Sequence, residues 1–133
     1  MNNIINENPI INKSHFIGEI NQQKVIKTLK NFDIFVFASS SETFGISLVE
    51  AMAIGMPIVC SNKSSLPEIL EDGGLYFNPK NDFQLSKQIE LFIKNKTLRK
   101  EKALKAKIIS SKFNWDKNTK EFCKLINKLS KII

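Results

Sequence analysis

The chain has 133 residues, enough for one domain around one hydrophobic core. Its composition, 42% apolar and 25% charged, is typical of globular proteins, and no apolar run is long enough to cross a bilayer. The two cysteines, Cys60 and Cys123, lie far apart in a chain with one histidine, which argues against a metal site and against an oxidising compartment. The first residues do not resemble a signal peptide. We therefore expect a cytoplasmic protein without a metal.

The net charge is +7, and much of it lies between residues 94 and 131. A solvated helical surface is the simpler interpretation, because charge runs on helices are usually solvent faces. The alternative is attraction to phosphate-rich partners or to the inner face of a membrane, where the chain would be peripheral. The basic segment has few aromatic residues and no zinc-finger or RNP-like pattern, so we do not expect nucleic acid as a partner.

In chain order, residues 1–14 lack periodicity and are expected to form a flexible lead-in to a domain over residues 15–133. The apolar run HFIGEI, residues 15–20, predicts a strand that ends near Gly18. Asn21 is placed to cap a following helix over residues 22–32, where apolar residues recur at helical spacing.

Residues 33–38, DIFVFA, are apolar on both faces of a strand, which is typical of an interior strand in a parallel sheet. A loop then leads to a helix over residues 46–54, which Gly55 and Pro57 end in the expected order. Asp82 is expected to cap a later helix. The remaining predicted elements are strands at 57–60 and 75–78, a short helical turn within 61–70, and helices over 82–92, 97–110 and from about 115 to the end.

Strands alternate with helices through residue 92, which predicts an α/β fold: a partial Rossmann-like parallel sheet of about four strands with flanking helices. In such sheets ligands gather beyond the carboxyl ends of the strands. The loop over residues 39–45 leaves the carboxyl end of one predicted strand. We therefore expect a ligand near this loop.

The stretch SETFGISLVEAMAIGMP, residues 41–57, is the most informative part of the chain. Two carboxylates flank a Phe-Gly turn: Glu42 falls in the loop and Glu50 in the early turns of the helix. Free amides at a helix N-terminus favour an anion, and the carboxylates can accept hydrogen bonds from hydroxyl groups. A ligand with both a polyphosphate and several hydroxyls, such as a nucleotide sugar, would suit this arrangement.

From about residue 15 to the end, the chain resembles the C-terminal nucleotide-sugar-binding domain of retaining glycosyltransferases with the GT-B fold, the group that includes sucrose and glycogen synthases. The resemblance rests first on FVFASSSETFGISLVEAMAIGMPIVCS and then on LPEILEDGGLYFNP. Phe113 and Trp115 match a Phe-x-Trp pattern before the final helix of the family. The chain would correspond to the back half of such a domain and to about a third of a complete enzyme.

The resemblance implies a role for each matching residue. Glu42 would be the catalytic residue that contacts hydroxyls of the donor sugar. Glu50 would accept hydrogen bonds from the ribose. Gly45 would allow close backbone approach. The other residues implied to bind the donor are Phe44, Ile46, Ser47 and Leu48 around the sugar and diphosphate, and Gly18, Glu19 and Ile20 around the base.

The implied reaction moves a sugar from a nucleoside diphosphate donor to a glycan or lipid-linked acceptor with retention at the anomeric carbon, as in cell-envelope polysaccharide synthesis. No cofactor or metal is implied. The family's Gly-Arg loop and diphosphate-gripping Lys are not found upstream of residue 15. The resemblance therefore implies a partner: a separate chain or an N-terminal segment that completes the fold. The isolated chain is expected to be almost inactive.

Simpler interpretations stand beside these. Glu68 is expected to be a surface residue of a short helix, His15 to be structural, and Trp115 to anchor the last helix. The alternative function is a non-catalytic module that keeps the fold and binds a partner or membrane through its basic helices. A dinucleotide-binding function is disfavoured because no G-x-G-x-x-G loop follows a strand.

Overall fold

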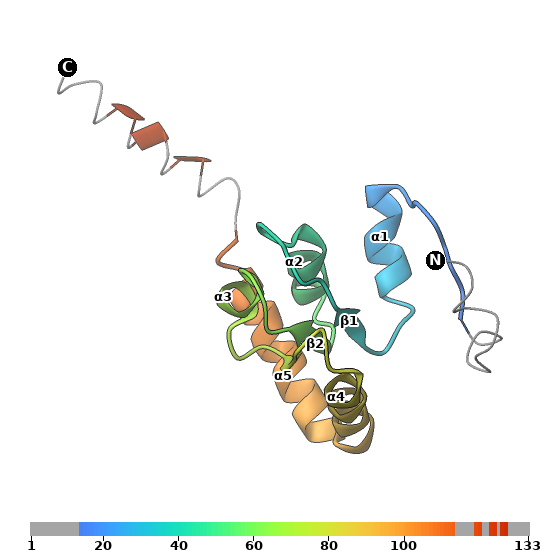
Figure 1. Cartoon of the computed structure of the whole chain (residues 1–133). Helices are drawn as coiled ribbons and strands as arrows, with labels where there is room; N and C mark the ends of the chain where they lie inside the picture. The colour runs from blue at the N-terminus through green and yellow to red at the C-terminus, as the bar shows by residue number, and fades with distance from the viewer. Residues whose placement is uncertain (1–13, 114–118, 121–122, 125, 128–133) are drawn as a thin grey trace.

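The computed structural model describes residues 14–113, 119–120, 123–124 and 126–127. Most of the expected lead-in, Trp115, and much of the helix expected from about residue 115 therefore lie outside the described residues. Within the described part, three parallel strands are flanked by helices (Figure 1). No helix of this part is both long and apolar enough to cross a membrane.

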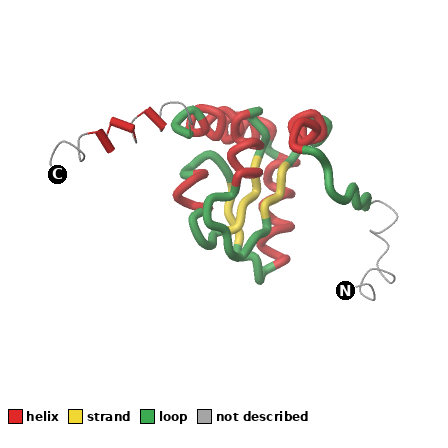
Figure 2. The backbone as a smooth tube through the Cα atoms, turned by 90° about the horizontal axis from the view of Figure 1, so that it is seen from above, coloured by secondary structure: helices red, strands yellow, loops and turns green. Residues whose placement is uncertain are grey.

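The sheet has the order β1-β2-β3, with β1 at Phe35–Phe37, β2 at Ile58–Ser61 and β3 at Leu75–Phe77. Val59 of β2 is aligned with Val36 of β1 and with Leu75 of β3. Helices lie on both faces of the sheet (Figure 2). These features confirm the predicted α/β fold with a parallel sheet.

The expected strand over residues 15–20 is wrong, and the described sheet has three strands rather than about four. This segment runs along the side of the first helix that faces away from the sheet (Figure 1). It therefore has no neighbouring strand to satisfy its backbone N–H and C=O groups. Phe16 and Ile17, the apolar residues that predicted the strand, are exposed instead.

The strand predicted over residues 33–38 exists, but it is not an interior strand of the described sheet. β1 forms hydrogen bonds to β2 alone and is therefore an edge strand. Its middle residue, Val36, is 38% exposed, whereas all four residues of β2 are buried. β1 therefore has apolar side chains on both faces although the described residues bury it only in part.

Local capping signals set where the helices begin. The side chain of Asn21 accepts a hydrogen bond from the Gln23 amide, as predicted. The cap of the fourth helix is Asn81, whose side chain accepts from the Gln84 amide, so the cap expected at Asp82 is wrong by one residue. The helices are α1 (Gln22–Leu29), α2 (Ile46–Ala53), α3 (Leu66–Leu70), α4 (Asp82–Lys94) and α5 (Lys96–Ser110).

The main core lies between α2, α3, α5 and the central strand β2. Leu48 and Met52 of α2, Ile58 of β2 and Ala106 of α5 are all fully buried. Burial of apolar surface of this kind is the dominant stabilising term in a small domain. The packing of α2 against α5 fixes the direction of α2, which matters because α2 carries the predicted site.

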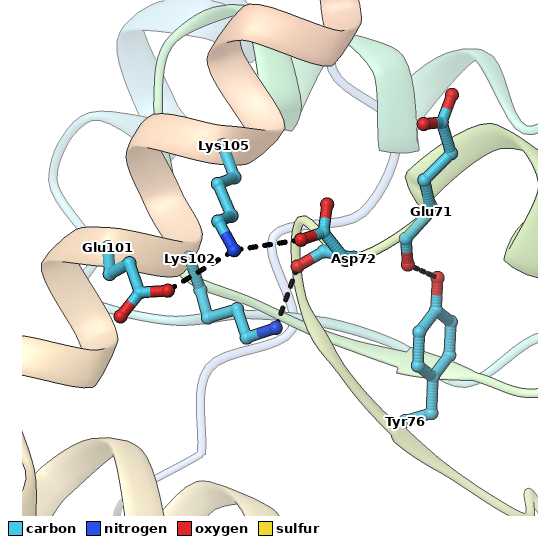
Figure 3. Close-up of polar contacts among 6 residues, drawn as sticks. All are labelled: Glu71, Asp72, Tyr76, Glu101, Lys102 and Lys105. Carbon is cyan, nitrogen blue, oxygen red and sulfur yellow. Dashed lines mark hydrogen bonds and ion pairs between the residues drawn. The ribbon is translucent and has the colours of Figure 1, made fainter.

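The turn over residues 71–74 attaches the end of α3 to α5 (Figure 3). Lys105 donates a hydrogen bond of 2.8 Å to the Asp72 carboxylate, and Lys102 donates one of the same length to the Asp72 carbonyl oxygen. The hydroxyl of Tyr76 donates to the Glu71 carbonyl oxygen at 2.5 Å. The ion pair between Lys105 and Asp72 is exposed and contributes little to stability, so the close packing of this turn matters more.

Gly74 should not tolerate a side chain. A Cβ atom at this position would lie 2.7 Å from the Ile58 carbonyl oxygen and 2.6 Å from Leu70 Cδ2. We expect Gly74→Ala to lower the free energy of unfolding by about 1–3 kcal/mol, because it overpacks a rigid core. Urea unfolding followed by circular dichroism would measure the change. Thr97→Ala on the exposed face of α5 is the control, and an unchanged midpoint in Gly74→Ala would contradict the packing described.

Tyr76 should make the fold sensitive to alkaline pH. Burial, together with the nearby Cys60, Asp72 and Glu71, raises the pKa of the Tyr76 hydroxyl above its usual value of 10.0. As the pH rises through about 10, the unfolded chain releases this proton before the folded chain does, so stability is unchanged below that pH and falls above it. Tyr76 is the only tyrosine of the chain, so tyrosinate absorbance reports its titration directly. Native titration at the pKa of a free tyrosine would contradict this assignment, and Tyr76→Phe should remove this contribution to the alkaline loss.

Candidate functional site

Two loops meet at the carboxyl ends of neighbouring parallel strands. The loop over residues 38–45 follows β1 and leads into α2, and the loop over residues 62–65 follows β2 and leads into α3. Because β1 and β2 are parallel and adjacent, both loops leave the same edge of the sheet. This edge is the position at which open α/β sheets bind ligands.

Gly45 sets the start of α2. Its φ of 70° is left-handed, and a Cβ atom there would lie 3.1 Å from Leu66 Cδ2, so both conformation and space favour glycine. Gly45 offers no side chain to cap the helix. The amides of Ile46 and Ser47 form no hydrogen bond with any residue of the described chain, whereas the Leu48 amide donates to the Gly45 carbonyl oxygen at 2.9 Å. Two amides at this helix N-terminus are therefore open to an anion.

Leu48 differs from its two neighbours. Its side chain is fully buried in the core, and its amide is engaged within the first turn of α2. Ile46 and Ser47 are exposed. Leu48 therefore holds the helix in place in this structure, while the amides of Ile46 and Ser47 have no hydrogen-bond partner among the described residues.

A groove of about 460 Å³ lies along one face of α2. The α2 residues that line it are three, four and seven positions apart, the spacing that places side chains on one helix face. The rings of Phe44 and Phe113 meet edge to face, with centroids 5.6 Å apart, at this groove. The lining residues are Ile26, Phe44, Ile46, Val49, Glu50, Ala53 and Phe113.

The chemistry of the groove is mainly apolar, with one carboxylate. Glu50 is partly buried and is the only charged residue among those that line the groove. Concave apolar surfaces with one fixed polar group bind and orient small organic molecules. An ionised carboxylate accepts hydrogen bonds but cannot donate them, so Glu50 would select hydroxyl or amide donors.

Glu42 lies in the adjoining loop and does not line the groove. Its amide donates to Ser64 Oγ at 3.1 Å, and its carbonyl oxygen accepts from Ser64 Oγ at 2.5 Å and from Ser65 Oγ at 3.2 Å. The backbone of Glu42 is thus bound to the loop that follows β2. Glu42 precedes the helix and Glu50 lies within it, with the Phe44–Gly45 turn between them.

The structure brings some of the predicted site residues together and leaves others apart. Phe44, Ile46 and Glu50 share the groove. Gly18 and Glu19 are exposed in the segment on the far side of α1 (Figure 1), and neither lines the groove. The sequence did not assign Ile26, Ser64, Ser65 or Phe113 to the site. Ser64 and Glu42, which are in contact, lie 22 residues apart in the sequence, and no local sequence pattern predicts this contact.

The described residues contain no group of three or more His, Cys, Asp or Glu side chains that could hold a metal ion. Cys60 is fully buried in the core, and burial raises the pKa of its thiol to about 12. A thiol of this kind is not a nucleophile near neutral pH. The carboxylates and the free amides are therefore the groups with which this site can act.

The contact between Phe44 and Phe113 should connect the end of α5 to the site. A double-mutant cycle with Phe44→Ala and Phe113→Ala should give a coupling free energy of about 0.5–1.5 kcal/mol, the usual value for an edge-to-face pair. Urea unfolding of the four proteins would measure it. A pair of Ala substitutions at Phe83 and Phe113, which are not among the aromatic pairs of the described residues, should be additive. Additivity in the Phe44 and Phe113 cycle would show that the two rings do not stabilise each other.

Comparison with known proteins identifies the family. Residues 1–109 match the family described as "Glycosyl transferases group 1". The chain is 34% identical over 85 residues to the O-antigen chain mannosyltransferase B of Escherichia coli, covering 64% of this chain and 22% of that protein. It is 31% identical over 126 residues to an uncharacterized glycosyltransferase of Methanocaldococcus jannaschii, covering 92% of this chain and 32% of that protein. The chain therefore spans between 22% and 32% of the length of these relatives.

Solved structures show the same fold. A sucrose-phosphate synthase from Thermosynechococcus elongatus superposes with a TM-score of 0.81 at 22% identity, over 90% of this chain and 31% of that one. The C-terminal domain of a glycosyl transferase group 1 family protein from Francisella tularensis superposes with a TM-score of 0.65 at 27% identity, over 73% of this chain and 51% of that one. The fold is part of the C-terminal domain of GT-B glycosyltransferases, as the resemblance implied. The chain belongs to the glycosyl transferases group 1 family.

Proposed function

We propose that the chain binds a nucleoside diphosphate sugar at the start of α2 and forms the donor-binding part of a retaining glycosyltransferase. The observation that carries this proposal is the juxtaposition of two open amides, at Ile46 and Ser47, with a groove that holds Glu50. The amides suit a diphosphate, and Glu50 suits the hydroxyls of a ribose. Family membership supports sugar transfer as the overall reaction.

Each group then has a role in positioning the donor. The diphosphate lies against the Ile46 and Ser47 amides, where Gly45 lets it approach the backbone closely. Glu42 contacts hydroxyls of the transferred sugar. The chemistry needs no covalent protein nucleophile, because holding the donor in place and stabilising the leaving diphosphate lower the barrier. The base-binding role of Gly18 and Glu19 would require the segment over residues 14–20 to approach the groove.

We propose a glycan or a lipid-linked saccharide as the acceptor. One relative, from Escherichia coli, is named as an O-antigen chain mannosyltransferase. Another, from Campylobacter jejuni, is named as an N-acetylgalactosaminyltransferase that acts on a diphospho-undecaprenol-linked sugar, and it is 34% identical over 87 residues. Both names describe polymer or lipid-linked acceptors, and this supports a place in cell-envelope polysaccharide synthesis. A location on the cytoplasmic side of the membrane is part of the same proposal.

Completion of the enzyme requires further polypeptide, because the chain spans only part of its relatives. We propose that this polypeptide, from a separate chain or from a segment preceding this sequence, adds strands to the sheet at β1. β1 is an edge strand in the described sheet, and its middle residue, Val36, is exposed. The chain alone would bind the donor weakly and transfer little sugar.

The second candidate function is a module that contacts an anionic membrane surface. The observation that favours it is on α5, where Leu104 and Ile108 are 61% and 62% exposed, one turn apart on its outward face. Lysine side chains flank this pair and would add attraction to anionic lipids, amounting to about 1 kcal/mol each near the surface. The flanking residues are Lys100 and Lys107.

Substitution of Glu50 tests the donor site. Titration with GDP-mannose and with UDP-N-acetylgalactosamine, followed by NMR of the full chain, should shift the amide signals of residues 42–50. Glu50→Gln should weaken binding of the responding donor by about 10- to 100-fold, because it replaces charged hydrogen bonds with neutral ones. Glu50→Gln should weaken the binding of GDP or UDP, which lack the sugar, by the same factor, since Glu50 is proposed to contact the ribose.

Glu68→Gln is the matched control, because Glu68 is exposed on α3 and does not line the groove. It should bind the donor as the wild-type chain does. The absence of shifts at residues 42–50 with both donors would contradict the proposed site. Salt-sensitive binding to anionic vesicles that Glu50→Gln leaves unchanged would then support the membrane-contacting function.

A further inference from the structure

We propose that Ser64 is a positioning residue for Glu42, and that the loop following β2 thereby sets the direction in which the Glu42 carboxylate meets the donor sugar. This inference rests on the proposed function and assigns a second loop to the same site. The Ser64 side chain belongs to no sequence motif considered above. Its role follows from the contacts that it makes.

One hydroxyl group forms hydrogen bonds with both the amide and the carbonyl group of Glu42. Ser64 Oγ accepts a hydrogen bond from the Glu42 amide at 3.1 Å and donates one to the Glu42 carbonyl oxygen at 2.5 Å. A serine hydroxyl has one donor and can accept as well, so both contacts can exist at once. Because the two groups flank the Cα atom of Glu42, the pair of bonds restrains both of its backbone dihedral angles.

Ser65 adds a third contact to the same residue. Its hydroxyl donates to the Glu42 carbonyl oxygen at 3.2 Å. A carbonyl oxygen has two lone pairs, and the two serine hydroxyls occupy both. The loop after β2 therefore contacts Glu42 through three hydrogen bonds. Within the loop of Glu42 itself, Ser39 Oγ donates to the Ser41 carbonyl oxygen.

The backbone of Ser64 supports a specific use of its hydroxyl. Its φ is 58°, a left-handed conformation that L side chains adopt rarely and that glycine adopts freely. A glycine would fit this turn with less strain but could not hold Glu42. Strained non-glycine residues cluster at sites where their side chains are needed.

The loop over residues 62–65 can hold Glu42 in place because hydrogen bonds fix both ends of this loop. At one end, the Lys63 amide donates to the hydroxyl of Ser61, the last residue of β2, which is fully buried. At the other end, the amides of Glu68 and Ile69 both donate to the Ser65 carbonyl oxygen at 3.1 Å and begin α3. Hydrogen bonds thereby connect Glu42 to the central strand as well as to its own loop.

The nucleotide end and the sugar end of the donor would therefore be bound by residues that different parts of the fold position. The nucleotide contacts, Glu50 and the Ile46 and Ser47 amides, are positioned by α2 itself. The sugar contact depends on Glu42 and hence on Ser64. Loss of the Ser64 hydroxyl should weaken the affinity contributed by the sugar and leave the affinity for the nucleotide alone unchanged.

The test compares Ser64→Gly, which allows the left-handed backbone but removes the hydroxyl, with Ser64→Ala and wild type as full chains. Dissociation constants for GDP-mannose and for GDP, and for the matching uridine pair, are measured by NMR. We expect Ser64→Gly to weaken sugar-nucleotide binding about tenfold and nucleotide binding by less than about twofold. Hydrogen exchange at the Glu42 amide should accelerate. Ser111→Ala, which removes a hydroxyl at the end of α5, is the control and should change neither quantity.

Equal loss of affinity for the sugar nucleotide and the nucleotide would overturn this role and indicate general loosening of the loop. Unchanged binding and unchanged exchange at the Glu42 amide would overturn it as well. If the wild-type chain binds none of the four probes, the proposed function fails and the role of Ser64 fails with it. A wild-type chain that binds them without the split in Ser64→Gly refutes the role of Ser64 alone.

Discussion

The site depends above all on the left-handed turn at Gly45. This turn reverses the chain between β1 and α2 within the space that Leu66 and Phe37 leave, and a Cβ atom would come within 3.1 Å of Leu66. Because Gly45 has no side chain, the first amides of α2 stay uncapped and open. The same turn places Glu42 on one side of the helix start and Glu50 on the helix itself. A side chain at Gly45 would strain the turn that lies between the two carboxylates of the proposed function.

The rest of the fold supports that turn. β2 is buried along its whole length. One end connects to α2 through Met56 and Pro57, and the other connects to α3 through the loop over residues 62–65. α5 also packs on α2. Phe113, which follows α5, contacts Phe44 at the groove. The close packing of Gly73 and Gly74 against Ala106 and Ile58 lets the turn after α3 lie flat against this layer. The site is thus built on the most buried part of the chain.

Local sequence signals predicted the features that depend on local physics. The start of α2 at Ile46 and the cap at Asn21 follow from spacing and composition, and the structure agrees. The strand predicted at residues 57–60 is also present, shifted by one residue to Ile58–Ser61. The strand expected over residues 15–20 failed because a strand requires a neighbour, and a single sequence does not show whether one is present. The cap shifted from Asp82 to Asn81 because either side chain can cap, and the turn geometry chooses between them. The serine contacts with Glu42 join residues 22 apart and could be found only in three dimensions.

The shortness of β1 has a consequence for how a larger assembly could form. A three-residue strand offers only a few backbone groups on its outer side, so main-chain pairing alone would hold an incoming strand weakly. Selectivity for the correct neighbour must then come from side chains that surround the edge, such as Phe32 and Val36, which remain exposed. A short edge also gives other copies of the chain little backbone on which to stack. The short edge strand thus disfavours aggregation through strand pairing but still allows a partner with complementary side chains to bind.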